Sequence, residues 1–489
     1  TKPFTSFNGD VELSVSDGII NPGSIDLVDG TGTIEVVMSG TGGQQILTAR
    51  AGGKTGSIVF NESLLDAIPG NPEDPVEGSI PEIYFAASTD YYSTGHPDLS
   101  GADLSHRIVI IVFELGTTVS EANAIISQHN ASIVGGLTGI NGQASGILFL
   151  ALPVDSHAEM ESALEDMRSD PHVSIAVQDI LVGTEEIPGE NAGNEVEWVW
   201  ETTPTGGNWG LELCRVPQTW NLNAAVRKSG RAVMTGIIDA GFEDLHEDLV
   251  YYNLTPGNEH YHGTMVAGII GATYNNGKGI DGINPFAGMT VKGVEHTSGS
   301  VVITDRSSAG QVYISNLYTV AKTYDQIKVI NVSLGYNWYL FDIDGTNDPA
   351  AQGLAYMQGA LLEQMLNLLS FFRPLPIITT PAGNESNQGF GVQEARYASP
   401  MTNAALEHGV ETIIVVEAVD HQLGTGSGDA VLADFSGIDG HISAPGFRIQ
   451  SLDLDNNCKI ASGTSFSAPF VAGVISYLLC LDPNLTIQN

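Results

Sequence analysis

The chain has few cysteines and no long apolar run, and each shortage excludes a class of protein. Its 489 residues include three cysteines, Cys214, Cys458 and Cys480, without any Cys-x-x-Cys spacing. This argues against a disulfide framework or a zinc knuckle and favours buried free thiols. No apolar run reaches the roughly 18 residues that a transmembrane helix needs, so no membrane span is expected.

Basic residues are also scarce. Eighteen Lys and Arg stand against 57 Asp and Glu, a formal net charge of −39. Such a surface repels nucleic acids and anionic membranes, so neither is expected as a partner. The chain begins Thr1-Lys2-Pro3-Phe4, with no Met and no signal peptide. We therefore expect a trimmed piece of a longer product.

The first half of the chain predicts three segments. Residues 1–65 contain short alternating runs between Asp-Gly and Gly-Gly turns, which predicts a small all-β sandwich. Residues 43–56 resemble the end of bacterial Ig-like domains of surface and secreted proteins, and a spacer is favoured over a binding module. Residues 66–105, rich in Pro, Gly, Asp and Ser, predict a linker.

Residues 106–180 alternate in the order β-α-β-β-α-β, which predicts a ferredoxin-like α+β domain. That fold hosts many roles, so by itself it does not define a function. An acidic, Gly- and Pro-rich segment, residues 181–207, follows, and a further domain then occupies residues 208–489.

Strands and helices alternate in the last domain, which predicts an α/β fold with a doubly wound parallel sheet. Its apolar run 232–238 is typical of a central strand buried on both faces, and it ends at Asp239. Carboxyl ends of such strands are where α/β sheets place functional groups, although for an isolated Asp a plain strand-ending turn is the favoured interpretation. His262 opens a helix rich in small residues. His260 and His262 lack a third ligand at useful spacing, so zinc is not expected.

Ser465 precedes a strongly apolar helical run. If it opens that helix, its Oγ lies where unpaired N–H groups and the helix dipole stabilise an anion. A Ser/Thr N-cap without catalytic role is the simpler interpretation of this stretch alone. Pro469 is expected in the first turn, where its missing N–H costs nothing.

Five motifs in order resemble those of the subtilisin-like serine proteases. They are IDAG (238–241), HGTMVAG (262–268), NVSLG (331–335), AGN (382–384) and GTSFSAP (463–469). No single motif decides the matter, but five in this order are specific. The resemblance covers residues 208–489, and the preceding unit 106–180 is similar to the subtilisin-type propeptide, an intramolecular chaperone and inhibitor.

The resemblance implies a role for each matched residue. Ser465 would be the nucleophile, His262 the general base and then acid, and Asp239 the group that orients His262. A serine hydroxyl needs a base with a pKa near neutrality, and histidine is suited to that role. Asn384 would donate its amide to the oxyanion beside the backbone N–H of Ser465.

The motifs also imply a substrate edge. Ser333, Leu334 and Gly335 match the strand on which a peptide lies by β-augmentation. Ala382 and Gly383, with Gly335, would leave room for the P1 side chain. We expect a secreted or surface-attached endopeptidase that cuts its own chain between about Asp179 and Gly207.

The sequence departs from the family pattern around the substrate edge. An insertion follows Gly335 and includes a predicted amphipathic helix at 350–372. Within the insertion, Asp342, Asp344, Asn347 and Asp348 place oxygen ligands as a calcium loop would. Such loops are more often turns, and the resemblance implies a calcium site elsewhere in the domain more readily than here.

Two other interpretations stay open. The chain could be a catalytically silent surface or filament protein that uses the fold as a building block, as the Ig-like region and the acidity suggest. It could also be a zymogen whose output is the processing of one partner protein. Retention of all triad residue types favours the protease.

Overall fold

The computed structural model describes residues 9–15, 19–21, 24–27, 37–39, 44–51, 54–61, 91–114, 117, 119–138, 144–184, 207–257, 260–293, 307–323, 326–370, 373–421 and 430–487. The chain divides into two compact units. The first holds residues 1–82, 111–150 and 165–176, and the second holds residues 83–110, 151–164 and 177–489.

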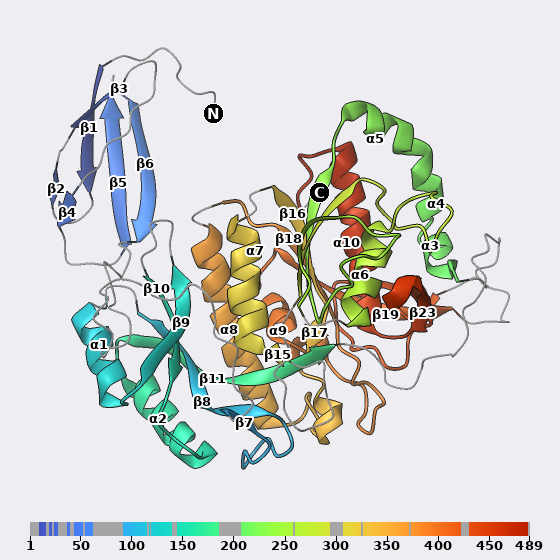
Figure 1. Cartoon of the computed structure of the whole chain (residues 1–489). Helices are drawn as coiled ribbons and strands as arrows, with labels where there is room; N and C mark the ends of the chain where they lie inside the picture. Colours follow the sequence, from blue (N-terminus) through green and yellow to red (C-terminus); the bar gives the residue numbers. More distant parts are fainter. Residues whose placement is uncertain are drawn as a thin grey trace. The chain divides into compact units, whose positions relative to one another are not determined.

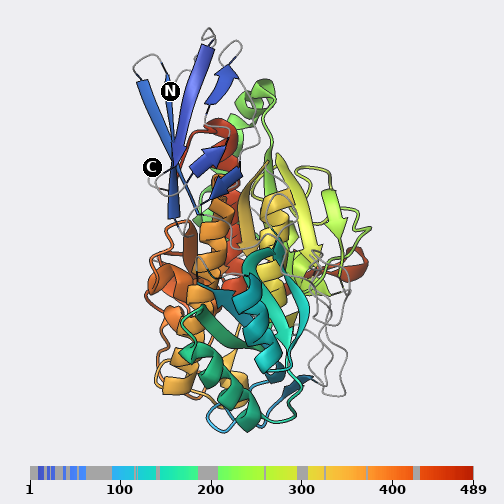
Figure 2. The same cartoon turned by 90° about the vertical axis from the view of Figure 1, so that its left-hand side faces the viewer.

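The first unit begins with short strands, as the turn spacing in residues 1–65 predicts. An antiparallel sheet has the strand order β3-β1-β5-β6, and β2 pairs with β4 in a second, two-stranded sheet. Figures 1 and 2 both show the long strands of the first sheet side by side. The bounds are β1 (Gly9–Val15), β2 (Ile19–Asn21), β3 (Ser24–Leu27), β4 (Val37–Ser39), β5 (Gln44–Ala51) and β6 (Lys54–Asn61).

The next elements follow the predicted order β-α-β-β-α-β. They are β8 (Leu104–Phe113), α1 (Val119–Gln128), β9 (Ser132–Thr138), β10 (Ala144–Ala151), α2 (His157–Ser169) and β11 (Val173–Thr184). Residues 108–113 of strand β8 are apolar and buried, as a central strand requires. Strands β8 and β11 and helix α2 each run from one unit into the other.

Two predicted boundaries are wrong. Residues 91–105, which we assigned to the linker 66–105, include strand β7 (Tyr92–Ser93), which pairs with β8. Tyr92 and Leu99 are buried, so apolar side chains hold this segment. Strand β11 also continues past residue 180 to Thr184. Residues 66–90 and 185–206 lie outside the described residues.

Three histidine rings meet in the second unit. The His157 ring centroid lies 5.3 Å from that of His96 and 5.9 Å from that of His106. His157 Nε2 lies 2.9 Å from Ser93 Oγ, while its buried Nδ1 has no hydrogen-bond partner in the described part of the chain. His96 Nδ1 accepts two backbone N–H groups, and its Nε2 lies 3.4 Å from Glu161. This packing favours the neutral form of His157 and His106.

Burial lowers the pKa of both His157 and His106. At His157 the hydrogen bond to the Ser93 carbonyl oxygen raises the pKa against burial, as does the charge of Glu161, while positive charge on His96 and His106 lowers it further. At His106 the charge of Arg107 lowers the pKa further, and Asp155 opposes it. Above the ordinary pKa of 6.5, both histidines are neutral in the folded and the unfolded chain. As the pH falls below that value, the unfolded chain binds protons that the folded chain resists, so stability is lost.

We therefore expect the thermal unfolding midpoint to fall on acidification from about pH 7.5 to 5.5, and to fall less in His157→Gln. The substitution removes the most crowded ring while keeping a polar side chain beside Ser93. Unfolding scans of the full chain at several pH values measure this. An identical pH dependence in the variant would assign the acid sensitivity to other groups.

The second unit contains the predicted doubly wound sheet, in the strand order β13-β14-β12-β16-β18-β19-β20. Its strands are parallel except β20, which is antiparallel to β19, and β21 adds a further parallel pairing with β19. The bounds are β12 (Val233–Asp239), β13 (Tyr251–Thr255), β14 (Ala287–Gly293), β16 (Ile327–Val332), β18 (Ile377–Pro381), β19 (Ile413–His421), β20 (Ala430–Leu432) and β21 (Ile442–Pro445).

Helices cover both faces of this sheet (Figure 1). Helices α6 (Tyr261–Gly271) and α10 (Thr464–Leu481) lie on one face, and α7 (Leu317–Thr323), α8 (Pro349–Ser370) and α9 (Pro400–Leu406) lie on the other. The remaining short elements are α3 (Trp209–Leu213), α4 (Val216–Thr219), α5 (Asn223–Ser229), β15 (Ser307–Ser308), β17 (Leu334–Gly335), β22 (Ile449–Leu452) and β23 (Cys458–Ala461).

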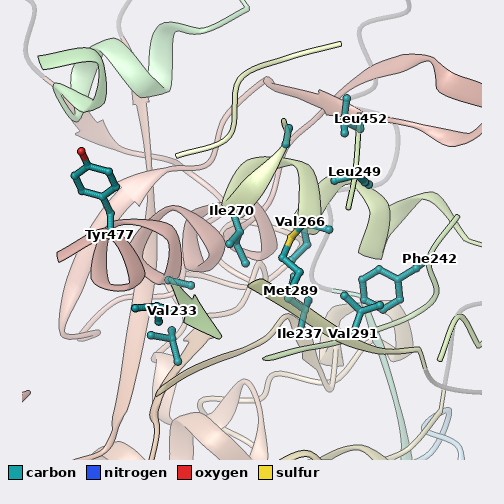
Figure 3. Close-up of a cluster of buried hydrophobic side chains, with 14 of the residues drawn as sticks. Val233, Ile237, Phe242, Leu249, Val266, Ile270, Met289, Val291, Leu452 and Tyr477 are labelled. Atoms are coloured by element: carbon teal, nitrogen blue, oxygen red, sulfur yellow. The ribbon is translucent and has the colours of Figure 1, made fainter. Parts of the chain in front are cut away.

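The core between sheet and helices explains the apolar runs of the sequence. Side chains from β12, α6 and α10 converge there, including Ile237, Ile270 and Tyr477 (Figure 3). Of the helices described, α10 alone is long and apolar enough to cross a membrane, but 72% of it is buried inside the domain, as in a core helix. Helix α8 matches the helix predicted at 350–372.

None of the three cysteines forms a disulfide. Cys480 is buried, Cys458 is half-buried and Cys214 is exposed, so the expected burial of thiols holds for Cys480 alone.

Candidate active site

The carboxyl end of β12 meets the first turn of α6 and brings Asp239 to His262. Asp239 Oδ1 accepts hydrogen bonds from His262 Nδ1 at 2.6 Å and from the backbone N–H of Ala240 at 2.7 Å. A Cβ at Gly263 would collide with the carbonyl oxygen of Gly241, so glycine permits this close approach. The side chains of Asp239 and His262 are fully buried. The carboxylate thereby fixes the orientation of the imidazole ring.

Ser465 lies in the first turn of α10, directly after Thr464. Its Oγ donates to the carbonyl oxygen of Ser333 at 3.2 Å. The ring of the next residue, Phe466, lies 5.2 Å from the His262 ring, centroid to centroid.

The expected position of Pro469 is wrong. It lies inside α10, beyond the first turn, because the helix already begins at Thr464. Because proline has no backbone N–H, one hydrogen bond inside the helix is missing at Pro469.

Asn384 follows strand β18, and hydrogen bonds to its side-chain oxygen hold the amide in place. Its Oδ1 accepts hydrogen bonds from the backbone N–H of Thr464 at 2.8 Å and from Thr464 Oγ1 at 2.9 Å. This orients the amide so that Nδ2 is the remaining donor. Nδ2 is buried and has no hydrogen-bond partner among the described residues. A preoriented, unused donor beside Ser465 is what an oxyanion site requires.

The predicted substrate edge is already paired with another strand of the same chain. Strand β11 runs antiparallel to β17, with Thr184 opposite Leu334 and Gly183 opposite Gly335. On its other side β11 pairs with β15. Ser333, Ser465 and the edge residues are buried in this arrangement. The segment that follows the ferredoxin-like unit thus lies on the edge expected for substrate.

The region predicted to receive the P1 side chain contains a carboxylate that sequence reasoning missed. Ala382 and Gly383 are buried there, and a Cβ at Gly383 would collide with Glu385 Oε2. Burial raises the pKa of Glu385 to about 7, opposed by the N–H groups of Glu385, Asn384 and Trp338. An acidic residue directly after the predicted oxyanion donor was the available signal.

In the loop that contains Asp342, side-chain oxygens accept hydrogen bonds from nearby protein groups. Asp344 accepts hydrogen bonds from the backbone and side chain of Asn347 and from Gln393. Asp348 Oδ1 accepts backbone N–H groups at the start of α8. Within the described residues no group of three or more His, Cys, Asp or Glu side chains could hold a metal. These hydrogen bonds make the loop a turn that leads into α8.

Comparisons with known proteins agree with the fold. The sequence pattern of the subtilase family (Peptidase_S8) matches residues 228–489. The chain is 28% identical over 296 residues to the minor extracellular protease Epr of Bacillus subtilis (strain 168), which covers 58% of this chain and 37% of that protein. It is 27% identical over 281 residues to thermitase of Thermoactinomyces vulgaris, which covers 55% and 81% respectively.

A solved structure shows the same fold. Fervidolysin from Fervidobacterium pennivorans, described as a keratinolytic enzyme related to subtilisin, matches with a TM-score of 0.54 at 19% identity. The match covers 84% of this chain and 59% of that one. The chain spans only 37%, 48% and 45% of the first three curated relatives that it matches.

A parallel sheet that presents an Asp–His pair, a serine at a helix N-terminus and an amide donor has the parts of a serine hydrolase site. The family pattern covers more than half of the chain. The chain belongs to the subtilase family.

Proposed function

We propose that this protein is a serine endopeptidase made as a self-processing zymogen. The observation that carries the proposal is the buried Asp239–His262 pair, with 2.6 Å between Oδ1 and Nδ1, on the same edge of the sheet as Ser465 and Asn384. The names of the relatives are those of proteases, which supports peptides or proteins as substrates.

The reaction follows from the groups present. His262 takes the proton of the Ser465 hydroxyl as Oγ attacks the scissile carbonyl carbon, and Asp239 stabilises the imidazolium that forms. The oxyanion receives hydrogen bonds from Asn384 Nδ2 and the backbone N–H of Ser465. His262 then protonates the leaving amine, and water hydrolyses the acyl-enzyme by the same steps in reverse order.

The pairing of β11 with β17 supports self-processing. Thr184 lies opposite Leu334, the residue directly after Ser333, and the carbonyl oxygen of Ser333 accepts the Ser465 Oγ hydrogen bond. We propose that the ferredoxin-like unit 106–180 inhibits the enzyme by holding β11 on the substrate edge. The cut then falls beyond Thr184, in residues 185–206, which narrows the window of 179–207 expected from the sequence.

Two measurements test the proposal. Purified chain is incubated, and any new N-terminus is sequenced; we expect one that lies between residues 185 and 207. The processed protein is then treated with an active-site-directed fluorophosphonate, which we expect to label Ser465. A chain that stays intact and unlabelled after long incubation would favour the silent scaffold, the alternative that the extreme acidity suggested.

Two further parts of the proposal concern the location of the protein and a bound calcium ion. The extracellular protease among the relatives and the net charge of −39 support an extracellular or cell-surface location.

We also propose a structural calcium ion at a site other than the Asp342–Asp348 turn. The predicted result is that calcium raises the thermal unfolding midpoint equally in the natural chain and in Asp344→Asn. Loss of that stabilisation in the variant would place the ion at the turn.

A further inference from the structure

The carbonyl group of Ser465 lacks its usual helical donor. In an α-helix the carbonyl of residue i accepts the N–H of residue i+4. For Ser465 that residue is Pro469, inside α10, which has no N–H. Ser465 is fully buried, and a buried carbonyl without a donor destabilises the fold. The backbone of the proposed nucleophile therefore needs a donor from another element.

Ser333 is that donor. Its Oγ donates to the carbonyl oxygen of Ser465 at 3.0 Å, and Ser465 Oγ donates to the carbonyl oxygen of Ser333 at 3.2 Å. The two serines thus hold each other by reciprocal hydrogen bonds. When Ser465 Oγ turns to His262 for catalysis, the bond from Ser333 Oγ is the one that still fixes the backbone of the nucleophile.

Two further buried side chains decide where the single hydroxyl proton of Ser333 points. Asn331 Nδ2 donates to Ser333 Oγ at 2.9 Å, and Thr379 Oγ1 donates to Asn331 Oδ1 at 2.9 Å. Asn331 and Thr379 lie opposite each other on the paired strands β16 and β18, and both are fully buried. Because Thr379 occupies Oδ1, the Asn331 amide presents its nitrogen to Ser333, whose proton is left for Ser465.

We propose that Thr379 is a positioning residue for the nucleophile, acting through Asn331 and Ser333. It does not contact Ser465 itself. Without its hydroxyl, the Asn331 amide can turn over and accept the Ser333 proton, which leaves the Ser465 carbonyl without a donor. A small shift of the nucleophile then lowers the rate, since reacting atoms must be held in near-attack geometry. This inference rests on the proposed role of Ser465.

The test compares Thr379→Val, which has the same shape without the hydroxyl, with Thr379→Ser, which keeps the hydroxyl. The first-order rate of self-cleavage is measured on the full chain, and kcat and KM are measured on the processed enzyme with a peptide. We expect Thr379→Val to lower the self-cleavage rate and kcat about tenfold with KM changed less than about twofold. Thr379→Ser should stay within about twofold of the natural chain in all three.

Thr380 gives a matched control. It is the next residue of β18 and is fully buried, and its Oγ1 has no hydrogen-bond partner in the described part of the chain. Thr380→Val should therefore process at the natural rate. Equal losses in Thr379→Val and Thr380→Val, or no loss in Thr379→Val, would overturn the inference.

A second variant covers the case in which Thr379→Val does not fold. Asn331→Asp still accepts from Thr379 but presents an acceptor oxygen to Ser333, so it should draw the Ser333 proton away and lower kcat similarly. Natural kcat in Asn331→Asp would overturn the inference. Self-cleavage that persists in Ser465→Ala would instead overturn the proposed function, so the two failures are distinguishable.

Discussion

Ser465→Ala is expected to remain a single intact chain under conditions in which the natural chain is cut beyond Thr184. Loss of the nucleophile in a triad of this type lowers kcat by a factor on the order of 10⁶. The measurement is the mass of the chain over time, with fluorophosphonate labelling as a second readout.

Ser467→Ala is the matched control for that experiment. Ser467 lies in the same helix, is also fully buried, and its Oγ has no hydrogen-bond partner within the described residues. The same atom is removed from the same helix, so a general effect on α10 would appear in both variants. We expect Ser467→Ala to be processed normally. Processing of Ser465→Ala at the natural rate, in a preparation free of other proteases, would refute Ser465 as the nucleophile.

The four principal site residues could be predicted because each depends on its neighbours in sequence. Asp239 ends an apolar strand, His262 and Ser465 open helices, and Asn384 follows a strand end. Parallel strands and the helices that follow them bring such positions to one edge of a sheet. The places of these residues in the fold follow from such local patterns, and the structure brings Asp239 and His262 into contact, while their roles stay predictions.

Features that depend on distant segments could not be predicted in the same way. The pairing of β11 with β17 joins residues far apart in the chain, and short strands carry little register information of their own. The pKa of Glu385 depends on its burial and on N–H groups that oppose the effect of burial, including that of Trp338 from another segment. The expected position of Pro469 is wrong because the sequence alone does not locate the first residue of α10.

The hydrogen-bond chain from Thr379 shows the same limit more sharply. Threonine is common in β-strands, so its presence in a predicted strand does not indicate a special role. Its role arises because Asn331 lies opposite it on the neighbouring strand and because Pro469 withholds an N–H from Ser465. Each of these facts is visible in the sequence, but only the strand register connects them.

Asn384→Asp is expected to lower kcat about 100- to 1,000-fold with little change in KM. Aspartate has nearly the same shape, and its oxygen can still accept the two hydrogen bonds from Thr464. It lacks the Nδ2–H donor, and its negative charge opposes the oxyanion. Such a donor contributes about 3 to 4 kcal/mol in the transition state and little to ground-state binding. Steady-state kinetics of the processed enzyme measure the effect.

Asn384→Leu separates the two functions of this side chain. Leucine removes both the donor and the acceptor, so Thr464 also loses its partner and the first turn of α10 is less well held. A larger loss in Asn384→Leu than in Asn384→Asp would mean that holding Thr464 matters as well. Full activity in Asn384→Asp would show that the oxyanion is stabilised without this amide, since the unused Nδ2 is the feature that assigns Asn384 its role. Tighter binding of a peptide aldehyde to the natural enzyme than to Asn384→Asp would confirm that the donor acts on the tetrahedral state, because the aldehyde adduct carries the same oxyanion.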